Sequence, residues 1–209
     1  MNRLHDIIDR FKAKRIVVVG DLVADVFVYG EISRISREAP VLILNHRETQ
    51  VVPGGGANAI HNLWALGATP VPVGVVGDDA EGQQLLGYFS KLGIEVSGIA
   101  VAKSLRTPSK MRILAGAVHS QRQQIVRLDS GCRLEDDKIR ADIKRKLKLA
   151  LKEADALLVS DYGFGLATPE IVSSLRPKSL TATLDSRFSL MNFSGMTAAT
   201  IVLCSLLFC

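Results

Sequence analysis

The stretch Pro53-Gly54-Gly55-Gly56-Ala57-Asn58 places three consecutive glycines directly before a segment whose apolar residues have helical spacing. Glycine tolerates positive φ angles and lets other groups approach the backbone closely, so this run suits a tight turn. If a helix begins here, the free N–H groups of its first turn can meet a hydroxyl group or an anion. A plain turn that caps a helix is the competing interpretation, and the glycines alone leave both open.

The run fits neither of the common nucleotide-binding patterns. GxGxxG after a strand is absent, and no Gly-Lys-Ser/Thr follows the glycines. Asn58 adds an amide side chain that offers both a hydrogen-bond donor and an acceptor. These groups favour a small polyhydroxylated ligand.

Upstream of the glycines, residues 15–20 form an apolar β-branched run that predicts a buried strand, and two acids follow it. Asp21 and Asp25 would then lie at the carboxyl end of the strand, the edge where ligands bind in open α/β sheets. Carboxylates there can accept charge-assisted hydrogen bonds from hydroxyl groups. The competing interpretation is that Asp21 is a turn former. Asp25 is the stronger candidate, because it precedes a strand-like run where an acid has little structural reason to be.

Downstream, apolar runs alternate with helical patterns, which indicates an α/β fold of βαβ units with a mostly parallel sheet. The expected strands are 69–76, 111–118, 123–128, 156–160 and 180–184, and the expected helices are 57–66, 79–92, 134–152 and 169–175. Residues 25–52 instead hold shorter and more polar stretches, which suit an exposed sheet that projects from the core as a second, smaller element.

Composition narrows the class of protein. The 209 residues, 47% hydrophobic and 22% charged, fit one globular domain. The net charge is +5, but the basic residues are dispersed and 5% of the chain is aromatic, so we expect no nucleic-acid partner and only a weak preference for phosphorylated ligands.

Cys132, Cys204 and Cys209 support neither a disulfide framework nor a zinc site. We expect a cytoplasmic protein without a membrane anchor.

Several separated motifs resemble the ribokinase/PfkB family of carbohydrate kinases. The glycine run, with Gly67 and Gly77 at the right distances, is similar to the first signature of that family. The segments that resemble its heptose-7-phosphate kinase branch, which serves ADP-heptose synthesis, are 20–25, 34–41, 123–129 and 160–163. The resemblance implies a Rossmann-like ribokinase fold with a mostly parallel sheet and a small β-sheet lid, whose strands would lie within about 25–52 and 107–129.

The resemblance also implies the site and its ligands. A kinase of this family transfers a phosphoryl group from ATP, with Mg²⁺, to a hydroxyl of a sugar or sugar phosphate. The residues expected to bind the substrate are Asp21, Asp25, Gly55, Gly56, Asn58 and Asp161, with Arg34, Lys110 and Arg112 for a phosphate already on it. Asp185 and Arg187 would contact the nucleotide. Lysine and arginine on strand faces are just as often merely solvated. The expected partner is a small-molecule sugar or sugar phosphate, and a homodimer through the lid sheet is a further hypothesis.

The chain also departs from the family pattern. Phe164 and Arg37 replace a lysine and a proline of the heptose branch, which leaves the sugar open. The Gly-Ala-Gly-Asp segment that carries the family's catalytic base has no counterpart, so no catalytic residue is assigned. We expect a partial kinase domain over 1–200 that lacks its C-terminal third, an apolar tail over 201–209 from another reading frame, and no useful kinase activity from these residues alone. The alternatives are a sugar-phosphate binding module and a lid-mediated dimerisation partner of an intact kinase.

Overall fold

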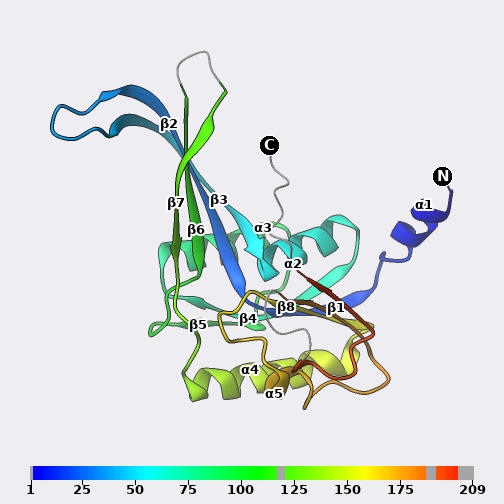
Figure 1. Ribbon diagram of the computed structural model, residues 1–209. Helices are drawn as coiled ribbons and strands as arrows, with labels where there is room; N and C mark the ends of the chain where they lie inside the picture. The colour runs from blue at the N-terminus through cyan, green and yellow to red at the C-terminus, as the bar shows by residue number, and fades with distance from the viewer. Residues whose placement is uncertain (1, 117–120, 187–191, 202–209) are drawn as a thin grey trace.

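The computed structural model describes residues 2–116, 121–186 and 192–201. A six-stranded parallel sheet forms the body, in the order β10-β9-β8-β1-β4-β5 (Figure 1). Its strands are β1 (Arg15–Gly20), β4 (Thr69–Gly77), β5 (Ile99–Ala102), β8 (Ala156–Asp161), β9 (Thr181–Ser186) and β10 (Ala198–Ile201). The helices are α1 (Asn2–Asp9), α2 (Gly56–Ala65), α3 (Ala80–Lys91), α4 (Asp137–Ala150) and α5 (Pro169–Val172). The mostly parallel α/β sheet predicted from the sequence is confirmed.

Both faces of this sheet are covered, α2 and α3 lying on one side and α4 and α5 on the other (Figure 1). Side chains of β1 alternate between the two layers, because successive residues of a strand point to opposite faces. Val18 packs in a core with Ile60 of α2, whereas Val17 packs in a second core with Leu147 of α4. Because these strands are parallel, their carboxyl ends lie at the same edge of the sheet.

A second, four-stranded sheet projects from this edge as the lid, in the order β3-β2-β6-β7 (Figure 1). It consists of β2 (Leu22–Ile35), β3 (Leu42–Gly55), β6 (Ser109–Gly116) and β7 (Gln123–Ser130). The prediction of short strands within 25–52 was wrong in length. The strands β2 and β3 are each 14 residues long and form one antiparallel pair. Register shifts interrupt this pair after Tyr29 and after Ile32.

Most other elements lie where the sequence predicted them. The α4 helix begins at Asp137 rather than at 134, because Asp136 caps it and accepts hydrogen bonds from the backbone of Lys138 and Ile139. The α5 helix is shorter than expected, and β5 and β10, each of four residues, were not predicted. Residues 202–209 of the apolar tail lie outside the described part of the chain. No helix within the described ranges is long and apolar enough to span a membrane.

Candidate functional site

The glycine run joins the lid to the body. Gly55 has a φ of 53° and stands at the N-terminus of α2, where no side chain caps the helix. The Gly56 N–H donates to the backbone oxygen of Asp21 at 2.9 Å. A Cβ on Gly54 would lie 2.6 Å from Oδ2 of Asp25, so glycine is needed for this close approach. Asn58 is exposed in the first turn of α2.

Asp25 and Arg112 lie on one face of the lid, near the body; this face, with Lys110, is called the lid face. Asp25 Oδ1 accepts a hydrogen bond from Arg112 Nη1 at 2.7 Å, and the two side chains are 23% and 21% exposed. The Arg112 guanidinium lies 5.2 Å from the centroid of the Phe27 ring. The structure thus brings Asp25 and Arg112 together, as expected if both contact one ligand.

Lys110 stands beside Asp25 on the neighbouring strand of the same face. Its side chain is buried, and its Nζ lies 5.1 Å from the centroid of the Tyr162 ring. Within the described residues Lys110 forms no ion pair with a carboxylate. Its ammonium therefore remains available for an anionic ligand.

Two residues that the sequence analysis did not single out complete this face. In the β6–β7 pairing, Asp129 is opposite Lys110 and Arg127 is opposite Arg112. Arg127 binds Asp129 through two nitrogens, at 2.6 Å and 2.5 Å. The hydrogen bond from Arg127 lowers the pKa of Asp129, and the charges of Lys110 and Arg112 lower it further. The sequence marked 123–129 as a segment that resembles the heptose branch, but neither that resemblance nor the charges of Arg127 and Asp129 could show which strand these residues would face.

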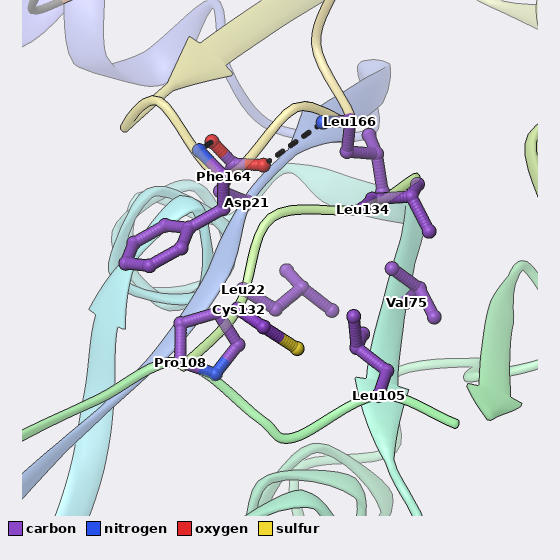
Figure 2. A pocket seen from close by; sticks show the side chains of 9 residues that line it. All are labelled: Asp21, Leu22, Val75, Leu105, Pro108, Cys132, Leu134, Phe164 and Leu166. Atoms are coloured by element: carbon purple, nitrogen blue, oxygen red, sulfur yellow. Dashed lines mark hydrogen bonds between the residues drawn. The ribbon is translucent and has the colours of Figure 1, made fainter. Parts of the chain in front are cut away.

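Asp21 is buried beneath the loop that follows β8, at 2% exposure (Figure 2). Its Oδ2 accepts from the backbone N–H groups of Tyr162 at 2.9 Å and Phe164 at 3.0 Å, and its Oδ1 from that of Leu166 at 3.3 Å. Burial raises the pKa of Asp21 to about 6. Direct binding of the substrate by Asp21 remains a prediction, since its oxygens are turned toward this loop.

Asp161 and Asp185 lie at the ends of adjacent strands. Asp161 is buried, accepting from the backbone of Gly163 at 2.9 Å and from Ser186 Oγ at 2.7 Å. Asp185 is half-buried, accepts from Thr200 Oγ1 at 3.1 Å, and has its pKa raised by desolvation. Arg187 lies outside the described residues. The described chain contains no group of three or more His, Cys, Asp or Glu residues able to hold a metal ion.

Arg34 is not brought to this site. It lies on the distal part of β2, exposed, nine residues beyond Asp25. At the rise of an extended strand this places it about 30 Å away along the lid. The β2–β3 hairpin that carries it extends away from the body (Figure 1). Within one copy of the chain, Arg34 therefore does not join Asp25, Lys110 and Arg112.

A small void lies under the loop, between Asp21, Phe164 and Cys132 (Figure 2). Its volume of about 10 Å³ is close to the space that one water molecule needs. A sugar does not fit there. The charged lid face above the sheet edge is the candidate binding surface.

The pfkB family carbohydrate kinase model matches residues 13–195 of this chain. The bifunctional protein HldE of Wolinella succinogenes is 40% identical over 166 residues, covering 77% of this chain and 33% of that protein. The HldE of Pelobacter propionicus is 31% identical over 207 residues, covering 95% and 40%. The chain thus spans between a third and two fifths of the length of these curated relatives.

Solved structures agree on the fold. Arabidopsis thaliana ribokinase, in complex with ribose and ATP, has a TM-score of 0.56 at 16% identity, covering 83% of this chain and 53% of that one. The tetrameric inhibited form of phosphofructokinase-2 from Escherichia coli has a TM-score of 0.57 at 16% identity, covering 83% and 55%. At this identity the likeness establishes the ribokinase fold alone.

Proposed function

Because this chain belongs to the pfkB family of carbohydrate kinases, we propose that it provides the sugar-binding part of an ATP-dependent kinase. Its substrate is a sugar phosphate similar to heptose 7-phosphate, phosphorylated on a hydroxyl group. The observation that carries the proposal is the juxtaposition of one acid and two bases on the lid face, Asp25 with Arg112 and Lys110. The HldE relatives favour the heptose branch.

The chemistry of this face suits both ends of such a substrate. The Asp25 carboxylate can accept hydrogen bonds from sugar hydroxyls, while the amide of Asn58 and the backbone around Gly55 and Gly56 offer further donors. The ammonium of Lys110 and the guanidinium of Arg112 can bind a phosphate, which accepts charge-assisted hydrogen bonds. Asp161, at the end of β8, would stand near the reacting hydroxyl.

ATP and Mg²⁺ remain part of this proposal. Asp185, at the carboxyl end of β9, and Arg187 are the residues proposed to contact the nucleotide. Phosphoryl transfer depends on positioning and on stabilising charge. The 209 residues contain no Gly-Ala-Gly-Asp segment to supply the base, and the described residues offer no cluster that could hold a metal. We therefore assign no transfer step to these residues and expect no turnover from them alone. The protein's proposed location is the cytoplasm, as the sequence predicts.

Calorimetric titration of the purified chain tests the proposal. Heptose 7-phosphate, fructose 6-phosphate and ribose are compared, each with and without ATP and magnesium, alongside a phosphotransfer assay. We expect a phosphorylated sugar to bind more tightly than ribose, without turnover. A chain that unfolds cooperatively but binds none of the three sugars would contradict the proposal, and turnover would contradict the expected inactivity.

We also propose that the lid pairs with the lid of a second copy. Val126 and Leu128 of β7 lie opposite Ile113 and Met111, on the face of the lid turned away from Asp25, and are 42% and 52% exposed. Apolar side chains exposed in a row favour burial in an interface. Leu128→Glu should shift the molar mass in light scattering from dimer to monomer, whereas Val101→Glu, at an exposed position on β5, should not. A monomeric wild-type chain would contradict this pairing.

A further inference from the structure

The loop after β8 is held from inside the protein by one side chain. Three backbone N–H groups of this loop, those of Tyr162, Phe164 and Leu166, converge on the two oxygens of Asp21. Because the donors belong to the backbone, side-chain changes in the loop leave these contacts in place. A change at Asp21 that removes carboxylate oxygens therefore affects several of these contacts together.

The same loop carries the residue that contacts the lid. The Tyr162 ring lies under the Lys110 ammonium, at 5.1 Å, and joins the end of β8 to strand β6. A cation near the face of an aromatic ring is attracted by the ring quadrupole, more strongly when water is excluded. Lys110 is 9% exposed, so the contact is largely shielded from solvent. A displacement of the loop would therefore also displace the ring that the ammonium contacts.

The segment directly before β6 is held in place independently of this loop. The backbone oxygen of Pro108 accepts from Ala24 N at 2.8 Å, and Thr107 is tied to Asp79 at the start of α3. These contacts position the strand, but they do not reach the end of the Lys110 side chain. The Tyr162 ring contacts its charged end directly, and the Asp129 carboxylate on the neighbouring strand interacts with the same charge.

We propose that Asp21 is a positioning residue: it holds the 162–166 loop so that Tyr162 aims the Lys110 ammonium at the anionic group of the substrate. In this role Asp21 does not touch the ligand, unlike the direct contact predicted from the sequence. The choice of ligand rests on the proposed function. The link from Asp21 to Lys110 does not.

The link is tested without any ligand. In protein labelled with ¹³C at the lysine ε-carbons, the Lys110 signal, assigned with Lys110→Met, should be shifted by the ring current of Tyr162. We expect Asp21→Asn and Tyr162→Leu each to abolish that shift, and Asp21→Asn to speed amide exchange over 162–166 at least tenfold. Asp155→Asn is the matched control, because this surface acid also accepts a backbone N–H, from Arg15, but lies away from the loop.

An unchanged Lys110 signal and unchanged exchange in Asp21→Asn would overturn the proposal. Should Asp21→Asn fail to fold, Phe164→Pro removes one of the three donors and addresses the same contact from the loop. Titration with heptose 7-phosphate and with the unphosphorylated sugar then separates the two proposals. Asp21→Asn should weaken binding of the phosphorylated sugar about tenfold and spare the other. If the Lys110 shift is lost but wild type binds no sugar, the proposed function fails and the positioning role stands.

Discussion

Arg112 and Asp25 meet across the β2–β6 pairing through a 2.7 Å charge-assisted hydrogen bond, each about four-fifths buried. The two residues do not sit directly opposite each other, because Asp25 is in register with Lys110 and Arg112 with Phe27. The bond is therefore diagonal and leaves the second oxygen of Asp25, Oδ2, facing Gly54. A ligand on this face meets an acid that is already oriented.

Removing the charge of Asp25 should weaken sugar binding. For Asp25→Asn we expect an affinity about tenfold lower or worse, about 1.4 kcal/mol, because the amide loses a charged acceptor and the bond to Arg112. Calorimetry with heptose 7-phosphate measures it. Glu31→Gln is the control, since Glu31 is on the same strand and paired with Arg47, away from the site. Equal affinities for Asp25→Asn and wild type would refute this role.

A methyl group at Gly54 should disturb the site. Gly54→Ala puts a Cβ 2.6 Å from Asp25 Oδ2, so the carboxylate must move, and we expect sugar affinity and stability both to fall. Gly87→Ala is the matched control. Gly87 lies within α3 with nothing near its Cβ position, so alanine there should stabilise the protein by about 0.5–1 kcal/mol. Urea unfolding and calorimetry on both variants check the pair, and unimpaired binding by Gly54→Ala would contradict the expectation.

The Thr107 hydroxyl should matter for stability. It donates to Asp79 Oδ1 at 2.6 Å and accepts from the Gly77 N–H at 2.8 Å. In Thr107→Val, Asp79 loses this hydroxyl as a donor and the Gly77 N–H loses it as an acceptor. We expect a loss of about 1–3 kcal/mol in the free energy of unfolding. Thr49→Val, which removes an exposed hydroxyl bonded to His46, should change it by less than about 0.5 kcal/mol. Similar losses in the two variants would count against a special role for Thr107.

Asp21 should make stability fall as the pH rises. Its pKa is raised from 3.8 to about 6, so between these values the folded protein holds a proton that the unfolded chain has released. The contribution is present below pH 4 and is lost as the pH rises through 6, a change of about 3 kcal/mol. The unfolding free energy of wild type minus that of Asp21→Asn should decline by about this amount from pH 4 to pH 7. A flat difference would show that Asp21 titrates normally.

The groups with lowered pKa do not obscure this test. Asp79, Asp129 and Asp142 contribute stability above their ordinary pKa that is lost as the pH falls. Their trend is opposite to that of Asp21. Because both proteins contain these groups, their contribution cancels in the difference.

The candidate site was predicted in part. Gly54 to Gly56 and Asp25 could be found from the sequence, since glycine runs and acids after a buried strand are local signals. Arg127 and Asp129 could not, because their place beside Arg112 and Lys110 depends on how β7 pairs with β6. Arg34 was expected to lie with Lys110 and Arg112, but the length of β2 places it far from both.

By itself, the sequence determined the alternation of strands and helices, the parallel sheet and the glycine turn before α2, because apolar periodicity and glycine conformation act over a few residues. Only the tertiary structure decided which charges meet. Asp25 pairs with a residue 87 positions away, and Asp21 reaches a loop that begins 141 positions away. Such contacts depend on strand register and on loop position, and a shift of one residue would turn every side chain of a strand to the opposite face.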